Sequence, residues 1–152
     1  MTPEGHAAMH TELAHLKSVE RPRISKEIGV AREHGDLREN AEYHAAKEKQ
    51  GMVEARIREL EDKIARAEVI DPTSFSGTKI KFGARVTLED ADSGKKVEYR
   101  IVGPDEASME KATISVTAPL ARALIGREPG DEVTVRAPGG ERTWSVVTVR
   151  WS

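Results

Sequence analysis

Apolar residues in the first 70 positions recur at the spacing of an α-helix. In the second part of this stretch they stand four, three, four and three residues apart, at Val53, Ile57, Leu60, Ile64 and Ala67. Residues with this spacing line up along one side of a helix. The earlier part follows the same rule at Leu13, Leu16, Ile24, Ile28 and Ala31. We therefore predict two long helices, each with one apolar stripe.

Pro22 interrupts the first of these helices. A proline fits the first turn of a helix but disrupts a helix interior, because it lacks an N–H and its ring clashes with the preceding turn. The sequence therefore predicts a kink or short break near residues 19–21, with a new helical segment after it.

A short connection, HGDLREN at residues 34–40, joins the two predicted helices. Neither helix is stable alone with so narrow an apolar stripe, because most helical stability in proteins comes from packing. A short connection lets the helices fold back antiparallel and bury their stripes against each other. Residues 1–72 are thus predicted to form a coiled-coil hairpin with residues 34–40 at its tip, about 45 Å long for an arm of roughly 30 residues.

The pattern changes after residues 70–74, IDPTS, whose proline and polar residues indicate a linker. Strand-like runs follow at residues 80–89, 95–103, 113–116, 131–137 and 143–149. Turn signals separate strand pairs at residues 92–94 and 138–140. A short helix is predicted from Pro119 to Ile125, closed by Gly126. Residues 77–152 are therefore predicted to form a small antiparallel sheet with one helix, which makes the fold class α+β.

Composition narrows the classes of function. The chain has no cysteine, which excludes disulfides and thiolate metal sites, and only 4% aromatic residues, which argues against a deep aromatic pocket. Its net charge of −2 gives no basic field for coating nucleic acid. No apolar run reaches the roughly 20 residues of a membrane span, and the N-terminus lacks the pattern of a signal peptide. The sequence predicts a soluble cytoplasmic protein with no membrane partner.

Two carboxylates, Asp36 and Glu39, stand three residues apart within HGDLREN. One interpretation is a capping box, with Asp36 as the N-cap of the second helix and Glu39 at its third position. The helix dipole also favours acids at an N-terminus. The other interpretation is that the two acids are the functional groups of the hairpin. The two do not exclude each other, because a capped tip is also a preorganised one.

Residues 31–51, AREHGDLRENAEYHAAKEKQG, resemble the tip of the Gre family of bacterial transcript cleavage factors. Residues 117–133, TAPLARALIGREPGDEV, followed by APGGE, resemble the same family, as do residues 99–107, YRIVGPDEA. The resemblance thus covers nearly the whole chain. It implies a coiled-coil hairpin in residues 1–72 and an FKBP-like, polymerase-binding domain in residues 77–152.

The resemblance also implies a transcription elongation factor that is not itself an enzyme. Such a factor binds bacterial RNA polymerase, inserts its hairpin tip through the secondary channel and stimulates the polymerase's own cleavage of backtracked RNA. It meets nucleic acid through the elongation complex, at the RNA 3′ end. It has no cofactor or metal of its own, because the Mg²⁺ ions lie in the polymerase active site.

By motif position, Asp36 and Glu39 are the two acids on which the family relies. Cleavage by two metals uses Mg²⁺ ions about 3.5–4 Å apart, and Mg²⁺ prefers carboxylate oxygens. The resemblance therefore implies that one acid helps to hold the second Mg²⁺ and that the other orients the water.

Other residues near the tip are candidate contacts to RNA. Arg32, Arg38 and Lys47 suit phosphates, and Tyr43 suits stacking on an unpaired base. The alternative is a solvated helix face with ordinary ion pairs. Lys47 stands where the family often has Arg, and a lysine cannot make a bidentate contact. Asn40 and His44 are expected only to shape the turn.

In the second domain, the resemblance implies that Thr117, Pro119 and Leu120 grip a coiled coil of the polymerase at the rim of the secondary channel. Ala118 stands where the family often has Ser, which removes any hydroxyl contact there. The alternative for the short helix is simple packing against the sheet, which we expect for Leu124.

Two rival functions stay open from the sequence. An inhibitory Gre homologue would block the secondary channel without cleavage, although such relatives tend to carry a denser acidic tip. A coiled-coil adaptor would use the same layout, and its tip charges would be dispensable. With 12 basic and 14 acidic residues in positions 1–70, the hairpin is not strongly basic, which favours the GreA-like over the GreB-like branch.

Metal binding and isomerase chemistry are less favoured. His34 and His44 flank the acids, but an exposed tip offers little second shell for zinc. His6 and His10 stand four apart, a spacing that also occurs on ordinary helix surfaces. Six aromatic residues are too few to predict the aromatic-lined proline pocket of a prolyl isomerase. The FKBP-like fold implied by the resemblance does not by itself imply isomerase activity.

Overall fold

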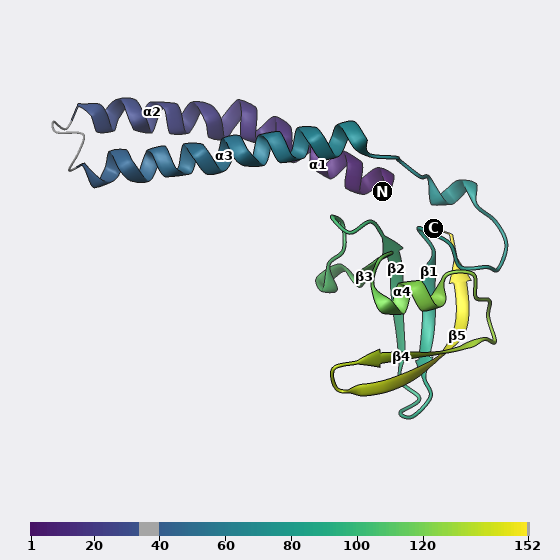
Figure 1. Ribbon diagram of the computed structural model, residues 1–152. Coiled ribbons are helices and arrows are strands. Elements are labelled where there is room, and N and C mark those ends of the chain that lie inside the picture. The colour runs from purple at the N-terminus through teal and green to yellow at the C-terminus, as the bar shows by residue number, and fades with distance from the viewer. Residues whose placement is uncertain (34–39, 152) are drawn as a thin grey trace. The chain divides into compact units, whose positions relative to one another are not determined.

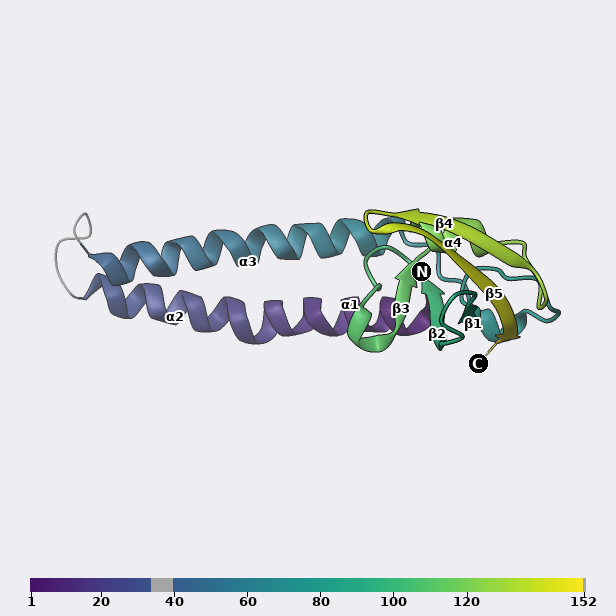
Figure 2. The same cartoon turned by 90° about the horizontal axis from the view of Figure 1, so that it is seen from below.

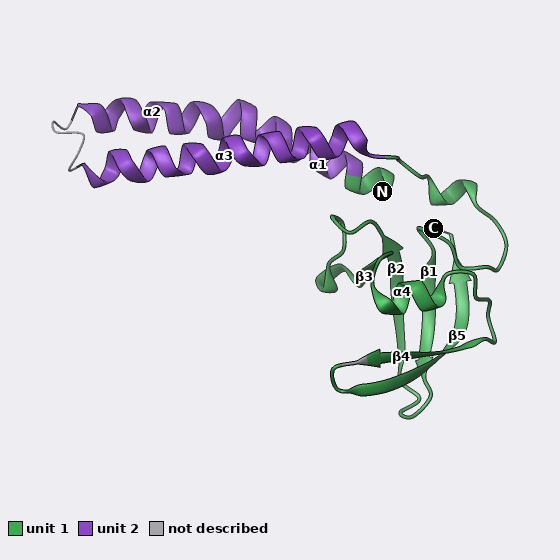
Figure 3. Cartoon of the chain, in the orientation of Figure 1, with its two compact units in different colours: residues 1–5, 68–152 green, residues 6–67 purple. Residues whose placement is uncertain are grey.

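The computed structural model describes residues 1–33 and 40–151 (Figure 1). The chain forms two compact units, coloured separately in Figure 3. Residues 6–67 make up the hairpin unit, and residues 1–5 together with residues 68–152 make up the sheet unit. The chain therefore passes between the units twice, once after Gly5 and once after Ala67.

The hairpin unit contains the predicted pair of long helices. Its first arm consists of α1 (Pro3–His15), the π-helical turn η1 (Leu16–Glu20) and α2 (Arg21–Arg32). Its second arm is α3 (Ala41–Arg66), which lies beside α2 in both Figure 1 and Figure 2. Pro22 lies in the first turn of α2, as predicted. The predicted break is a π-helical turn, because His15 and Glu20 both keep right-handed helical backbone angles.

The seam between α2 and α3 is apolar and narrow. Ile24, Ile28 and Ala46 form a buried cluster, and Tyr43 and Val53 pack against it. Further along α3, Ile57 is 2% exposed and Leu60 is fully buried. The predicted stripe is therefore confirmed at its centre.

Ion pairs flank this seam and link the two arms. Arg21 donates from Nε and from its second terminal nitrogen to the two carboxylate oxygens of Glu54, at 2.8 and 2.9 Å. Arg56 holds Glu12 in the same bidentate way, at 2.8 and 3.0 Å. Lys17 also pairs with Glu61 at 2.6 Å. Exposed pairs of this kind add little stability each, so they mainly favour one register of the arms.

The sheet unit is built on five strands in the order β3-β2-β1-β5-β4. The strands are β1 (Arg85–Asp90), β2 (Lys96–Val102), β3 (Thr113–Ser115), β4 (Glu132–Ala137) and β5 (Gly140–Arg150). Neighbours pair antiparallel except β2 and β3, which are parallel. The predicted α+β fold is confirmed, but the sheet is mixed rather than wholly antiparallel.

A short helix, α4 (Pro119–Leu124), is present where it was predicted. Gly126 follows it with a φ of 87°, a conformation that suits glycine after a helix. Ala121 and Leu124 are fully buried in the main core beside Val86, Leu88 and Ile101. The predicted packing of Leu124 is therefore confirmed.

The strand predicted from residue 80 begins only at Arg85. Gly83 has a φ of 86°, which interrupts an extended strand. The backbone before it bonds elsewhere, since the Ile80 N–H donates to the carbonyl of Arg127 at 2.8 Å. A one-turn 3₁₀ helix, η3 (Met109–Lys111), was not predicted.

The segment predicted as a linker packs on the sheet unit. It contains η2 (Pro72–Ser74), capped by Asp71, whose carboxylate accepts from the Thr73 N–H at 3.0 Å. Pro72 is buried, and a Cβ on Gly83 would lie 2.5 Å from the Pro72 Cβ. The indole N–H of Trp151 donates to the Gly77 carbonyl at 3.0 Å. Residues 71–77 are therefore held in place, and the unit boundary lies earlier, after Ala67.

Within the two described stretches, residues 1–33 and 40–151, none of the helices combines the length and apolar character needed to cross a bilayer.

The Glu12–Arg56 pair predicts an acid-range stability effect. The hydrogen bond from Arg56 holds the pKa of Glu12 below its ordinary value of 4.5. The stability from this pair is therefore complete above pH 4.5 and is lost as the pH falls through the lowered folded-state pKa. We expect Glu12→Gln to cost about 0.2–1 kcal/mol at pH 7, as for other exposed pairs, and almost nothing at pH 2.

Urea unfolding followed by helical circular dichroism at several pH values measures this difference. Glu48→Gln, an exposed change on α3, is the matched control. A cost of Glu12→Gln that stays constant from pH 7 to pH 2 would contradict the prediction.

Candidate functional site

The described part of the hairpin tip consists of the two helix ends. The first arm ends with Arg32 and Glu33, and α3 begins at Ala41 after its N-cap, Asn40. The predicted tip residues Asp36, Arg38 and Glu39 lie outside the described residues, and so does His34.

Asn40 joins the two helix ends through one side chain. Its carbonyl oxygen accepts a hydrogen bond from the Tyr43 N–H at 3.1 Å, which caps the start of α3. Its amide nitrogen donates to the carbonyl of Ala31, near the end of α2, at 2.6 Å. Asn40 thus connects the two helix ends by hydrogen bonds.

The N-cap of α3 is therefore Asn40, and the capping box that makes Asp36 the N-cap is wrong. The third helical position belongs to Tyr43, which has no carboxylate to reach back to the cap.

Arg32 and Tyr43 come together beside the tip. The guanidinium carbon of Arg32 lies 6.0 Å from the centre of the Tyr43 ring, within the range of a cation–π contact. The ring is half-buried, because it also packs against the Ile24–Ile28–Ala46 cluster. Lys47 lies one turn further along α3, is exposed and donates to the Gln50 side chain at 3.1 Å.

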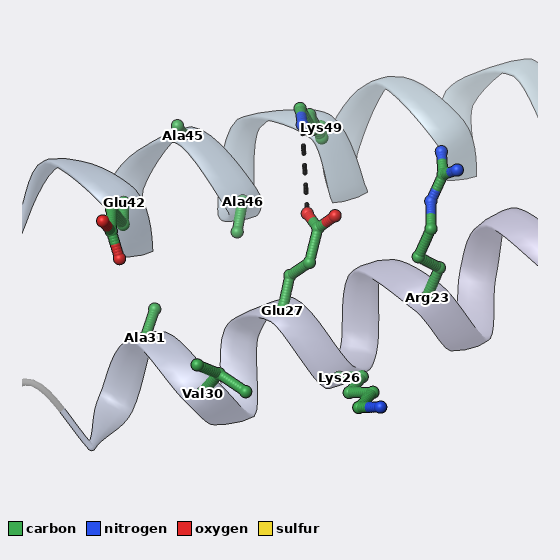
Figure 4. Close-up of a pocket in the computed structure, with 9 residues that line it drawn as sticks. All are labelled: Arg23, Lys26, Glu27, Val30, Ala31, Glu42, Ala45, Ala46 and Lys49. Atoms are coloured by element: carbon green, nitrogen blue, oxygen red, sulfur yellow. Dashed lines mark ion pairs between the residues drawn. The ribbon is translucent and has the colours of Figure 1, made fainter.

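A groove of about 450 Å³ runs between α2 and α3 next to the tip (Figure 4). Four of its lining side chains are small or apolar, namely Val30, Ala31, Ala45 and Ala46. The other five are charged, namely Arg23, Lys26, Glu27, Glu42 and Lys49. Lys49 pairs with Glu27 across it at 3.9 Å, as the dashed line in Figure 4 shows.

Sequence reasoning missed this groove, although a signal was present. Alanines at Ala31, Ala45 and Ala46 satisfy the helical pattern, but their short side chains cannot fill the space between two helices. Facing alanines in an otherwise Ile- and Leu-rich seam are the sequence signature of such a hollow.

The three predicted polymerase contacts lie on the approach to α4. The Thr117 N–H donates to the Ser115 hydroxyl oxygen at 3.1 Å, and the two hydroxyl oxygens are 2.6 Å apart. Thr117 and Pro119 are exposed, whereas Leu120 is half-buried and packs against the main core. Ile125, at the end of α4, is 41% exposed and adds apolar surface to this region.

Among the described residues, no group of three or more His, Cys, Asp or Glu side chains could hold a metal ion. The rings of His6 and His10 are 4.6 Å apart, edge to face, and they form no such group with a third residue in the described stretches.

Two family models together match almost the whole chain. Residues 1–69 match the N-terminal model of the GreA/GreB transcription elongation factors, and residues 76–150 match the C-terminal model. The chain belongs to the GreA/GreB family of transcription elongation factors.

Two relatives that are 58% and 56% identical agree with this membership. The transcription elongation factor GreA of Hyphomonas neptunium is 58% identical over 149 residues, which cover 98% of this chain and 95% of the relative. The GreA of Alkalilimnicola ehrlichii is 56% identical over 153 residues, or 100% of this chain and 97% of the relative. The crystal structure of GreA factor homolog 1 of Thermus thermophilus is 30% identical, covers 99% of this chain and 97% of that one, and has a TM-score of 0.44.

Asn40 provides a test of how the tip is closed. Asn40→Ala removes both hydrogen bonds, so we expect it to destabilise the hairpin by about 1 kcal/mol and to speed hydrogen exchange of the Tyr43 amide. Asn40→Asp keeps the acceptor for Tyr43 but loses the donor to Ala31, so the Tyr43 amide should stay protected in that variant. Equal exchange of this amide in the wild type and in Asn40→Ala would disprove the capping role.

Proposed function

We propose that this factor stimulates the cleavage of backtracked RNA by bacterial RNA polymerase, with the loop of Asp36 and Glu39 delivered through the secondary channel. The observation that carries the proposal is the way the described residues frame this loop. One side chain, Asn40, ties the helix ends on both sides of it. The adjoining helix α3 has 26 residues, which gives an arm about 39 Å long at 1.5 Å per residue.

The correction of the N-cap supports this role for the acids. A carboxylate engaged in a capping box is committed to backbone N–H groups, whereas Asn40 already supplies the cap of α3. The match to the N-terminal GreA/GreB model spans residues 1–69, a range that includes both acids. The proposal therefore assigns Asp36 and Glu39 to a partner's chemistry rather than to the fold of the hairpin.

In the proposed cleavage step, water attacks the phosphorus and gives up a proton to solvent, while the 3′ oxygen of the upstream nucleotide leaves and takes up a proton from solvent. The polymerase's Mg²⁺ ions supply the activation of the water and the stabilisation of the leaving oxygen. One of the two tip carboxylates adds an oxygen ligand for the more loosely held ion, and the other accepts a hydrogen bond from the attacking water. This chain supplies no metal of its own in the proposal, so it acts as a factor and not as an enzyme.

The basic and aromatic side chains beside the tip are proposed to meet the RNA. Arg32 and Lys47 suit the phosphates near the 3′ end, and Arg38 lies between the two acids in sequence. The contact between Arg32 and Tyr43 supports this assignment, because it presents a guanidinium and part of an aromatic ring together. The half-burial of Tyr43 limits base stacking to its exposed part.

The sheet unit is proposed to bind a coiled coil at the rim of the secondary channel through Thr117, Pro119 and Leu120. The exposure of Thr117, Pro119 and Ile125 around one short helix supports this contact. An apolar patch with polar groups at its edge is the usual form of a site that accepts a partner helix.

Removing the tip acids tests the cleavage mechanism. In a stalled, backtracked elongation complex with Mg²⁺, the wild type should release short 3′ RNA fragments. Asp36→Asn and Glu39→Gln should each reduce the rate by about a hundredfold or more, as when a single transition-state contact is lost, while binding to the polymerase survives. Asp62→Asn and Glu48→Gln, the same chemical changes on the exposed side of α3, should retain full activity.

Two outcomes would overturn this mechanism. Cleavage that persists in the Asp36→Asn, Glu39→Gln double variant would mean that the acids do not act in the reaction. Slower elongation without fragments from the wild type would instead make the protein a blocker of the channel.

Changes on the sheet unit test the docking site separately. Thr117→Ala combined with Pro119→Ala should weaken binding to the polymerase about tenfold, which corresponds to about 1.4 kcal/mol, because contacts at the centre of such a patch carry most of the affinity. Cleavage at saturating factor should be unchanged. Arg136→Ala, on strand β4, is the exposed control. Unchanged competition for the polymerase by the double variant would place the docking site elsewhere.

A further inference from the structure

We infer that Glu106 is a positioning residue that fastens the first turn of α1 to the sheet unit, so that the hairpin is attached through two chain connections instead of one. Glu106 lies in the loop after β2, 104 residues away from Thr2 in sequence. Its carboxylate is nevertheless the centre of a hydrogen-bonded cluster that includes residues 2, 5 and 103.

One carboxylate serves three donors. The Oε1 atom of Glu106 accepts from the Thr2 N–H and from the Thr2 hydroxyl, both at 2.7 Å. The Oε2 atom accepts from the Gly103 N–H, also at 2.7 Å. Thr2 is only 2% exposed. Bonds to a carboxylate are stronger than those between neutral groups, so this cluster is a specific anchor for Thr2.

The hydroxyl of Thr2 links the anchor to the helix. It donates to Glu106 and at the same time accepts from the Gly5 N–H at 3.1 Å, which is the N-cap bond of α1. A hydroxyl can do both, because it carries one proton and two lone pairs. The start of α1 and its attachment to the sheet unit therefore depend on the same oxygen atom.

Gly5 shows how close Glu106 comes to the helix. A Cβ on Gly5 would lie 1.8 Å from the Oε1 atom of Glu106 and 2.4 Å from its carboxyl carbon. Glycine is unfavourable inside a helix, by about 1 kcal/mol relative to alanine. Its presence in the first turn of α1 is explained by the space that the Glu106 carboxylate occupies.

Two further contacts hold residues 1–5 in the sheet unit. Glu4 pairs with Arg100 of β2 at 3.3 Å, and the Arg100 side chain is only 11% exposed. The carbonyl of Met1 accepts from the Ile70 N–H at 2.9 Å, just after the second crossing at Ala67. Both crossings between the units are therefore fixed on the sheet side.

The two crossings differ in backbone conformation. The first lies inside the continuous helix α1, between Gly5 and His6, whereas the second follows the end of α3, where Ala67 is extended. The Glu106 cluster therefore joins the start of α1, a helix that continues into the hairpin unit, to the loop after β2.

Spin labels and hydrogen exchange test this inference on the full chain. Cysteines introduced at Glu48 and Arg136, in a protein with no other cysteine, report the distribution of distances between the units. Glu106→Ala and Thr2→Val should broaden that distribution and speed exchange of the Gly5 amide about fivefold or more, as for a lost N-cap. Thr2→Ser, which keeps the hydroxyl, and Glu110→Ala, an exposed change in the next turn, should match the wild type.

Gly5→Ala provides an independent test. Its methyl group would displace the Glu106 carboxylate, although alanine has a higher helix propensity than glycine in α1. It should behave like Glu106→Ala. Protection of the Val86 and Ile101 amides verifies that the sheet unit stays folded in every variant. Wild-type distance distributions and Gly5 exchange in Glu106→Ala and Thr2→Val, with the sheet unit intact, would overturn the inference.

The consequence for RNA cleavage rests on the proposed function. If that function holds, Glu106→Ala should lower cleavage at limiting factor and Thr2→Ser should not. If the wild type stimulates no cleavage, the proposed function fails, and the distances and exchange rates still decide the role of Glu106.

Discussion

The hairpin depends on the burial of one narrow apolar seam between α2 and α3. Each helix presents too little apolar surface to be stable alone, so each exists only because the other covers it. Ile24 and Ile28 on one side, with Ala46 on the other, form the buried cluster nearest the tip. The connection between the helices, the register of the ion pairs and the position of Asn40 all follow from the requirement that these stripes meet.

The seam also explains why the tip is closed by a hydrogen-bonding side chain. Near the tip the seam narrows to alanines, which leave the groove shown in Figure 4 and contribute little burial. The helix ends therefore need another source of cohesion, and Asn40 supplies it by bonding to both. The two helices are thus held together by apolar packing in the middle of the hairpin and by the hydrogen bonds of Asn40 at the helix ends near the tip.

Sequence patterns predicted the elements whose formation depends on residues close together in the chain. The helical period marked Ile24, Ile57 and Leu60 because a helix places such residues on one side, and Pro119 and Gly126 marked the ends of α4. The capping rule failed because Asp36 and Glu39 match it in sequence, whereas Asn40, with Tyr43 three residues later, does not.

Features that join distant parts of the chain could not be read from local patterns. The parallel pairing of β2 with β3, the packing of Pro72 under Gly83 and the bonds from Thr2 to Glu106 each depend on tertiary contacts. Of the candidate site, the sequence predicted the tip motif and the α4 region. The alanine-lined groove was found only in the structure, because small residues fit a helical pattern whether or not they fill the space between the helices.

One residue, Asn40, bonds to both helix ends of the hairpin. The side chain of Asn40 both caps the start of α3 and bonds to the Ala31 carbonyl near the end of α2. A substitution at this single position would therefore weaken the start of α3 and the end of α2 together.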